Sequence, residues 1–125
     1  MARILIAEDE EALGALCARA LAGDGHEVKT AADGGAALDE LARQEGRFDL
    51  LLTDIRMPVM DGIALALAAA RDFPDLTILL MTGYADQRER AHGLDAIVHD
   101  IIAKPFSVAA LRSAVNEALA VRARG

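Results

Sequence analysis

The sequence has very few of the residues on which several common protein classes depend. It contains no Trp, one Tyr, three Phe and one Cys among 125 residues. The single cysteine, Cys17, excludes an internal disulfide and a metal site made of several cysteines, and it suits a reducing cytoplasm. Because aromatic side chains are so scarce, the core has to be aliphatic, and the 54% of hydrophobic residues can supply it.

Basic residues and long hydrophobic runs are also scarce. Thirteen Lys and Arg residues against twenty Asp and Glu residues give a formal net charge of −7. This charge argues against nucleic acid or an anionic membrane as a direct partner. The first apolar run, residues 4–7, is too short for a signal peptide or a membrane span. We therefore expect a cytoplasmic protein with a single domain over residues 1–125 and no output domain.

Short apolar runs alternate with segments of helical periodicity along the chain. Strands are expected at residues 4–7, 28–31, 48–53, 76–81 and 101–103. Helices are expected around residues 13–21, after residue 33, at residues 63–73 and 86–92, and after residue 107. Leu16 and Cys17 fall on the apolar stripe of the first helix, and Val108 on that of the last. Such alternation predicts an α/β fold with a doubly wound, five-stranded parallel sheet and helices on both faces.

Polar side chains suited to phosphoryl transfer stand at the predicted ends of the strands. Glu8 and Asp9 follow the first strand, Asp54 the third, Thr82 the fourth and Lys104 the fifth. These ends meet at the sheet edge where open α/β sheets bind ligands. Three carboxylates there repel one another, and a hard dication such as Mg²⁺ offsets that repulsion. A carboxylate nucleophile at Asp54 would form an aspartyl phosphate.

Simpler and competing explanations exist for the same residues. Acids at the first turn of a helix stabilise it, Thr82 can cap a turn, and Lys104 can be a solvated base. Convergence from four strand ends favours a common site over these separate roles. The site could also belong to a small-molecule phosphatase that uses Asp54 as its nucleophile, although Arg56 stands where such an enzyme needs a second Asp. A module that binds partners without being phosphorylated is a third alternative.

The sequence resembles the bacterial response-regulator receiver domain, the CheY-like family. The matching motifs are Ala7-Glu8-Asp9, Asp54 to Met57-Pro58 with Met60-Asp61-Gly62, Met81-Thr82-Gly83, and Lys104-Pro105-Phe106. The resemblance implies a flavodoxin-like (βα)5 fold with strand order 2-1-3-4-5. It also implies a phosphoacceptor switch of a two-component or phosphorelay pathway, not an enzyme.

The same resemblance implies a role for each residue at the strand ends. Asp54 would be the phosphoacceptor, and a histidine kinase or histidine phosphotransferase would be the donor. Asp9, Asp54 and the backbone carbonyl of Arg56 would ligate Mg²⁺. Glu8 would reach the metal through water. Thr82 and Lys104 would contact the phosphoryl group.

The resemblance also identifies residues that would report phosphorylation. Many family members have an aromatic residue three positions before the Lys, where this sequence has Ile101. Tyr84, two positions after Thr82, is the only Tyr in the chain and could serve in its place. We therefore expect the switch to involve Thr82, Tyr84 and Ile101. Pro105 is a candidate for a cis peptide bond.

A narrower resemblance is to the single-domain CpdR type of receiver from alphaproteobacteria. It is clearest in residues 1–5, 52–55 and 81–84. It implies a role in regulated proteolysis, with the ClpXP protease machinery as downstream partner, in a protein that is a monomer or weak dimer. Action as a phosphorelay intermediate is the alternative. The CpdR type can carry a C-terminal Ala-Ala tail, whereas this sequence ends Arg122-Ala123-Arg124-Gly125.

Overall fold

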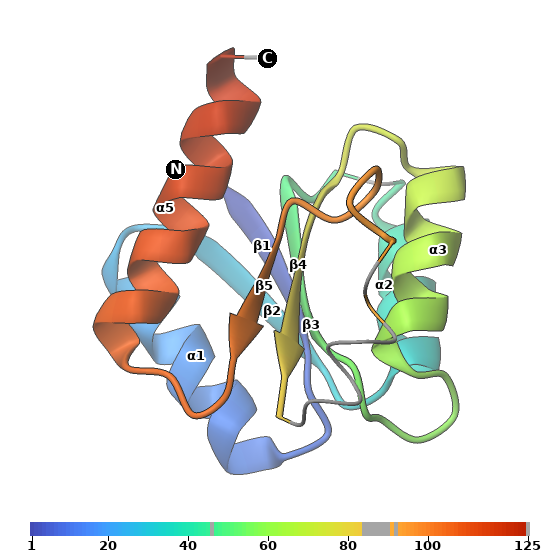
Figure 1. Cartoon of the computed structure of the whole chain (residues 1–125), viewed down its shortest axis with the longest axis horizontal. Helices are drawn as coiled ribbons and strands as arrows, with labels where there is room; N and C mark the ends of the chain where they lie inside the picture. The colour runs from blue at the N-terminus through green and yellow to red at the C-terminus, as the bar shows by residue number, and fades with distance from the viewer. Residues whose placement is uncertain (46, 84–90, 92, 125) are drawn as a thin grey trace.

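The computed structural model describes residues 1–45, 47–83, 91 and 93–124. Tyr84 and most of the helix expected at residues 86–92 lie outside the described residues. Figure 1 shows a sheet in the middle of the molecule, with α1 and α5 on one face and α2 and α3 on the other.

The sheet has five parallel strands in the order β2-β1-β3-β4-β5. This arrangement confirms the expected fold class and strand order. The strands differ from the expected ones by no more than two residues at either end. Their bounds are Arg3–Ala7 for β1, Glu27–Ala31 for β2, Leu50–Asp54 for β3, Thr77–Thr82 for β4 and Asp100–Ala103 for β5.

Four helices are found in the described part of the chain, and three of them begin at a side-chain cap. The helices are α1 (Glu11–Gly23), α2 (Gly34–Arg43), α3 (Gly62–Asp72) and α5 (Val108–Arg124). Asp33 accepts a hydrogen bond from the Ala36 N–H at 2.7 Å, and Asp61 accepts one from the Ala64 N–H at 2.8 Å. The Ser107 hydroxyl oxygen accepts one from the N–H of Ala110 at 3.0 Å. Each cap satisfies a backbone donor that the helix cannot satisfy itself.

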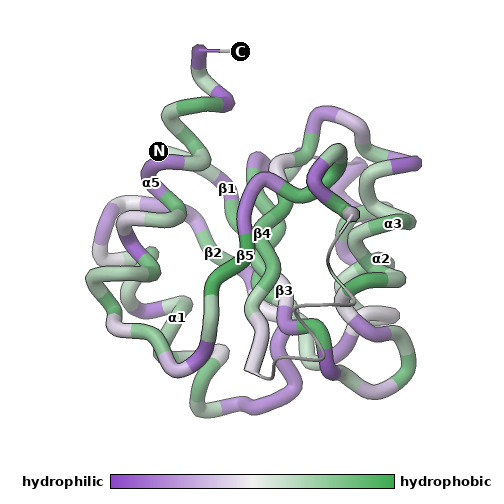
Figure 2. The backbone as a smooth tube through the Cα atoms, in the orientation of Figure 1, coloured by the Kyte–Doolittle hydropathy of each residue, from purple (hydrophilic) through white to green (hydrophobic). Residues whose placement is uncertain are grey.

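The aliphatic core forms two layers, one on each face of the sheet. Leu5 and Leu51 pack against α2 and α3, while Ile4 and Leu52 pack against α1 and α5. This alternation follows from the period of two in a strand. Both faces are covered, so β3 is buried at every position, and its first three residues are all leucine. Figure 2 shows the hydrophobic colouring concentrated on the central strands and the hydrophilic colouring on the surrounding loops.

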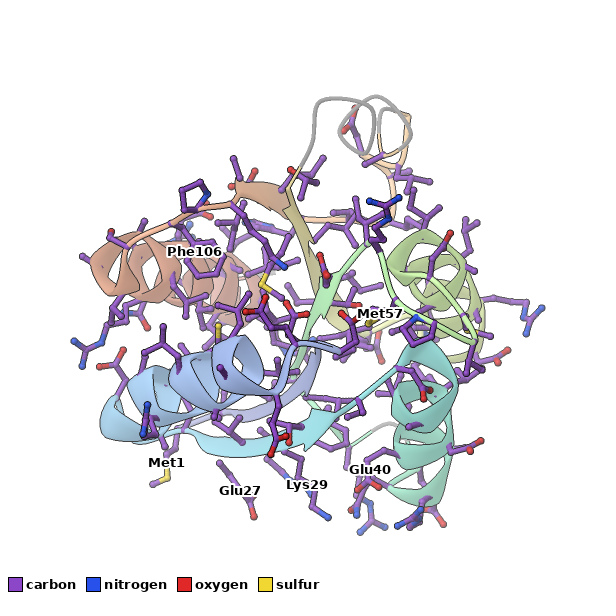
Figure 3. All side chains as sticks on the ribbon, turned by 90° about the horizontal axis from the view of Figure 1, so that it is seen from below. Met1, Glu27, Lys29, Glu40, Met57 and Phe106 are labelled. Carbon is purple, nitrogen blue, oxygen red and sulfur yellow. The ribbon has the colours of Figure 1, made fainter. Side chains whose placement is uncertain are left out.

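The edge strand β2 is much more polar than the central strands. Glu27, Lys29 and Thr30 are exposed, and such charged positions discourage pairing with another chain. Lys29 forms a 3.1 Å ion pair with Glu40 of α2, and both side chains are labelled on the same side of the molecule in Figure 3.

Two residues placed on apolar stripes are more exposed than expected. Leu16 is 43% exposed and Val108 is 37% exposed. In α1 the buried contacts are made by Cys17 and Leu21, so Leu16 lies at the margin of a stripe that is too narrow to include it. Val108 is the first residue of α5, one turn before Leu111, where that helix first enters the core.

Candidate functional site

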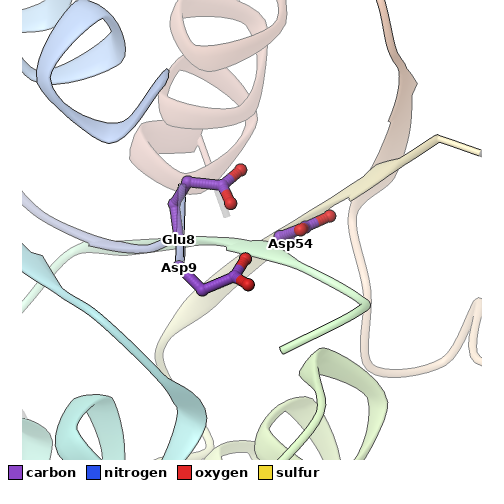
Figure 4. A group of neighbouring side chains, drawn as sticks. All are labelled: Glu8, Asp9 and Asp54. Atoms are coloured by element: carbon purple, nitrogen blue, oxygen red, sulfur yellow. The ribbon is translucent and has the colours of Figure 1, made fainter. Parts of the chain in front are cut away.

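Three carboxylates from two neighbouring strands meet at the carboxyl edge of the sheet. Glu8 and Asp9 directly follow β1, and Asp54 is the last residue of β3, which pairs with β1. One carboxylate oxygen from each lies within 4.8 Å of the others. Figure 4 shows the three groups gathered at one place. Glu8 and Asp54 are buried, whereas Asp9 is exposed.

Lys104 places a cation between two of these carboxylates. Its Nζ donates a 2.8 Å hydrogen bond to Glu8 Oε1 and lies 3.1 Å from Asp54 Oδ1. Lys104 directly follows β5, and its backbone N–H donates to the Thr82 carbonyl at 2.6 Å. The next peptide bond, Lys104–Pro105, is cis. The end of β5 thus brings a side chain 96 positions away in sequence onto Glu8 after β1, and beside Asp54 at the end of β3.

The pKa values reflect this ion pairing in a partly buried place. Burial raises the pKa of the Glu8 carboxyl, and the hydrogen bonds from Lys104 and from the Glu10 N–H oppose this effect. Burial alone would lower the pKa of Lys104. The hydrogen bond to Glu8 and the negative charge of Asp54 outweigh burial, so the pKa of Lys104 is raised. Lys104 therefore keeps its proton, and its charge, beside the two acids.

The residues after Asp54 are fixed by close backbone contacts. The Ile55 N–H donates to Asp54 Oδ1 at 3.0 Å, which orients the carboxylate. The Gly62 N–H donates to the Ile55 carbonyl at 2.7 Å. A Cβ atom on Gly62 would overlap the Asp54 carbonyl oxygen and lie 2.9 Å from Ile55 Cα. Glycine is therefore required where the first turn of α3 meets the end of β3.

An open cleft of about 580 Å³ gives access to the acid cluster. Its lining includes both charged and apolar side chains. Figure 3 shows Phe106 at the α5 side of this edge and Met57 toward α2 and α3. The lining residues are Glu8, Asp9, Glu10, Leu13, Asp54, Arg56, Gly83, Lys104, Pro105 and Phe106. The cleft has room for a small anionic group above the carboxylates.

The structure brings together most, but not all, of the residues that the sequence singles out. Arg56 lines the cleft with the acids and Lys104. Thr82 ends β4 and is 3% exposed, and it does not line the cleft itself. Ile101 is half-buried against the core layer of α2 and α3. Tyr84, expected to act with them, lies outside the described residues.

Four lining residues were not expected from the sequence as parts of the site, namely Glu10, Leu13, Gly83 and Phe106. Glu10 contributes its backbone N–H to Glu8 Oε2 at 3.1 Å. Leu13 and Phe106 add apolar side chains to the lining. Leu13 follows Glu8 and Asp9 by about one helical turn, and this short separation in sequence could have predicted that Leu13 lies near the two acids.

No helix in the described residues has the length and hydrophobicity needed to cross a membrane.

The donor set fits a small hard cation. Glu8, Asp9 and Asp54 offer oxygen atoms alone, which Mg²⁺ prefers over nitrogen or sulfur. Two Mg²⁺ ligand oxygens on opposite sides of the ion lie about 4.2 Å apart. The spacing within this cluster is therefore close to what a single ion with additional water ligands requires.

Comparison with known proteins identifies relatives of nearly the whole chain. The sequence matches the model of the response regulator receiver domain over residues 4–116. It is 40% identical over 117 residues to the response regulator receiver protein CpdR of Brucella abortus (strain 2308), covering 94% of this chain and 93% of that protein. It is 37% identical to the response regulator MprA of Mycobacterium avium (strain 104), covering 85% of this chain and 46% of MprA. The chain thus matches nearly all of CpdR but about half of MprA.

Solved structures agree with this result. A CheY-like receiver domain protein of Methanospirillum hungatei superimposes with a TM-score of 0.90 at 30% identity, covering 99% of this chain and 98% of the other. The response regulator TrrA of Thermotoga maritima, solved in complex with Mg(2+)-BeF, gives 0.82 at 29% identity, covering 94% and 99%. The chain belongs to the response regulator receiver family of two-component signalling proteins.

Proposed function

We propose that Asp54 accepts a phosphoryl group from a phosphohistidine in a histidine kinase or histidine phosphotransferase, in a reaction that depends on Mg²⁺. One observation carries the proposal. The Asp54 carboxylate stands at an open cleft with Lys104 Nζ 3.1 Å away and two further carboxylates beside it. A nucleophile, a cation and a set of oxygen ligands are the parts that phosphoryl transfer needs.

The proposed metal ligands all offer oxygen atoms, which Mg²⁺ prefers. Asp9, Asp54 and the backbone carbonyl of Arg56 would ligate Mg²⁺, and Glu8 would reach it through water. When bound, Mg²⁺ supplies positive charge that offsets the repulsion between the carboxylates and an incoming phosphoryl group. The complex of TrrA with Mg(2+)-BeF supports this proposal by homology.

In the proposed transfer, Asp54 is the nucleophile, and Lys104 and Thr82 stabilise the phosphoryl group. A carboxylate oxygen of Asp54 forms a bond to phosphorus, and the bond from phosphorus to the donor's imidazole nitrogen breaks. The electron pair of that bond returns to the imidazole. Lys104, already 3.1 Å from Asp54, stabilises the charge on the phosphoryl oxygens. Thr82 ends the neighbouring strand and would donate a hydroxyl hydrogen bond to the phosphoryl group.

Phosphorylation would switch the surface next to the site. It adds roughly 1.5 to 2 negative charges at the cleft. Lys104 and Thr82 are joined by a backbone hydrogen bond, so both strand ends would respond to that charge. Thr82, Tyr84 and Ile101 form the proposed switch. A nearly complete switch needs about 5.5 kcal/mol of differential stabilisation.

The phosphoryl donor would dock on α1 beside the cleft. Leu13 of α1 and Phe106 line the cleft, and Leu16, one turn further along α1, is 43% exposed. This apolar border is continuous with the site, so a phosphohistidine helix resting on it would face Asp54. Apolar contact of this kind suits a transient partner.

The downstream role is proposed from the resemblance to the CpdR type. The protein would act in the cytoplasm as a monomer or weak dimer and would prime a protease of the ClpXP kind. Nearly complete mutual coverage with CpdR at 40% identity supports this assignment. A phosphorelay intermediate would have the same site but would pass its phosphoryl group on to another histidine.

The test is intact-mass spectrometry after incubation with acetyl phosphate. A phosphoacceptor gains the mass of one phosphoryl group with Mg²⁺, does not gain it when the metal is chelated, and fails to gain it as Asp54→Asn. No adduct in the wild-type protein would contradict the proposal. Rapid hydrolysis of varied phosphomonoesters would instead favour a phosphatase, a weaker candidate because Arg56 occupies the position of its general acid.

A further inference from the structure

Thr53 is a polar side chain buried in an apolar part of the sheet. It stands one residue before Asp54 on β3 and is 0% exposed. Its neighbours on the adjacent strands, Ala7 of β1 and Leu80 of β4, are also 0% exposed. Side chains alternate along a strand, so Thr53 faces the same core layer as Leu51, which packs against α2 and α3. A buried hydroxyl is costly unless it is hydrogen-bonded, and valine has nearly the same shape without that cost.

The hydroxyl of Thr53 is hydrogen-bonded to the carbonyl oxygen of Asp54. The donor and acceptor oxygens lie 2.9 Å apart, and the Met57 sulfur, a weaker acceptor, lies 4.0 Å from Thr53 Oγ1. The Ile55 N–H of the same peptide group donates to β4, so the Asp54 carbonyl, on the opposite side of a trans peptide, points toward β1. The pairing of β1 with β3 ends at Ala7 and Thr53. The Thr53 hydroxyl therefore supplies a donor just beyond the last strand pair.

The same peptide group also orients the Asp54 carboxylate. Its N–H, from Ile55, donates to two acceptors, the Met81 carbonyl at 3.2 Å and Asp54 Oδ1 at 3.0 Å. Oδ1 is also the oxygen that lies 3.1 Å from Lys104 Nζ. The carbonyl and the N–H belong to one rigid plane, so a rotation of that plane would move the N–H away from Oδ1. The hydroxyl that holds the carbonyl therefore also helps to hold the carboxylate.

We propose that Thr53 is a positioning residue for phosphoryl transfer, because its buried hydroxyl fixes the peptide between Asp54 and Ile55 and thereby the direction of the Asp54 carboxylate. The inference rests on the proposed function, since it concerns how the proposed nucleophile is held. Thr53 is not among the described residues that line the cleft, so it acts through Asp54 and not by touching the phosphoryl group. The competing explanation is structural, with a hydroxyl that adds only to stability.

Two substitutions separate positioning from a purely structural role. Thr53→Val removes the hydroxyl, whereas Thr53→Ser keeps the hydroxyl and removes a buried methyl group. Both should unfold at a lower urea concentration than wild type, because each loses one stabilising feature. Only Thr53→Val should slow phosphorylation, by about five- to tenfold, while Thr53→Ser stays within about twofold of wild type. The measurement is the initial rate of adduct formation by intact mass, at saturating Mg²⁺ and acetyl phosphate. Equal rates in the two variants would overturn the inference.

The matched control makes the same chemical change at the other end of the neighbouring strand. Thr77 begins β4, at the end opposite to Thr82, and its hydroxyl oxygen lies 3.5 Å from Arg122 Nη1. Thr77→Val should leave the initial rate of phosphorylation within about twofold of wild type. A loss in Thr77→Val as large as in Thr53→Val would show that the rate follows the stability of the sheet, and the inference would be wrong.

A second measurement tests the inference without metal or phosphoryl donor. The amide proton of Ile55, assigned by NMR in the metal-free protein, should move upfield in Thr53→Val, because its bond to the Asp54 carboxylate weakens. It should stay close to its wild-type position in Thr53→Ser. An unchanged shift in Thr53→Val would contradict the inference. If the wild-type protein gains no phosphoryl group, the proposed function fails, and this shift still decides whether Thr53 holds the carboxylate.

Discussion

Replacement of Gly62 by alanine should destabilise the fold where α3 meets the phosphoacceptor strand. The added Cβ would overlap the Asp54 carbonyl oxygen and approach Ile55 Cα to 2.9 Å. These neighbours are backbone atoms, so relief requires α3 to move away from β3. That movement would weaken the 2.7 Å hydrogen bond from the Gly62 N–H to the Ile55 carbonyl.

The expected cost follows from these two effects. Overpacking a tight site costs roughly 1–3 kcal/mol, and a weakened buried hydrogen bond costs about 1 kcal/mol. The better helix propensity of alanine returns somewhat less than 1 kcal/mol. We expect Gly62→Ala to lower the free energy of unfolding by about 1–3 kcal/mol. Because the carbonyl of Asp54 moves as well, phosphorylation by acetyl phosphate should slow.

Gly14→Ala is the matched control in α1. Its Cβ would make an ordinary 3.7 Å contact with Glu8 Cβ, and alanine favours a helix interior by about 0.5–1 kcal/mol. Urea unfolding followed by circular dichroism compares the two variants with wild type. Gly62→Ala should shift the midpoint down and Gly14→Ala should shift it slightly up. A Gly62→Ala protein as stable as wild type would show that the contact between α3 and β3 is looser than described.

Three further predictions concern other parts of the fold. Burial raises the pKa of the Cys17 thiol from 9.0 to about 11, so the folded protein keeps a proton that the unfolded chain loses. The free energy of unfolding should therefore fall by roughly 2 kcal/mol between pH 9 and 11, and by less in Cys17→Ala. Urea unfolding at each pH measures this change. Val59 has φ 70° and is 86% exposed, so Val59→Gly should stabilise by about 0.5–1 kcal/mol, by the same assay. Mg²⁺ at a hundred times its dissociation constant should raise the free energy of unfolding by about 2.7 kcal/mol, measured by calorimetry. A thermal unfolding curve that does not change with Mg²⁺ would contradict a metal site.

The sheet and its order could be expected from the sequence because its signals are local and strong. The run from Leu50 to Leu52 has no polar residue, which indicates a strand covered on both faces, and β3 is buried at every position. The strand β2 lies at an edge of the sheet, where its exposed Glu27, Lys29 and Thr30 are typical. The residues at the strand ends then follow from the fold, because parallel strands end at one edge.

The detailed arrangement of the site depends on contacts that no local pattern contains. Glu8 and Asp9 are adjacent and chemically alike, yet one is buried against Lys104 and the other is exposed. That difference is decided by how β5 lies against β4 and delivers Lys104 to β1. The positive φ of Val59 also results from tertiary packing, since it overrides the preference of a β-branched residue. The exposure of Leu16 shows that the same holds for helices. Helical periodicity predicts where an apolar stripe runs, but it does not predict how wide the buried part of that stripe is.

The central claim is that Asp54 is the residue that carries the phosphoryl group. Borohydride reduces an acyl phosphate on an aspartate to homoserine, so treatment after incubation with acetyl phosphate and Mg²⁺ marks the acceptor permanently. Peptide mass spectrometry should find homoserine at position 54, and nowhere when the metal is chelated. Homoserine at Asp9 or at another acid, or equal labelling with and without Mg²⁺, would contradict the account of the site given by Asp54, Asp9 and Lys104.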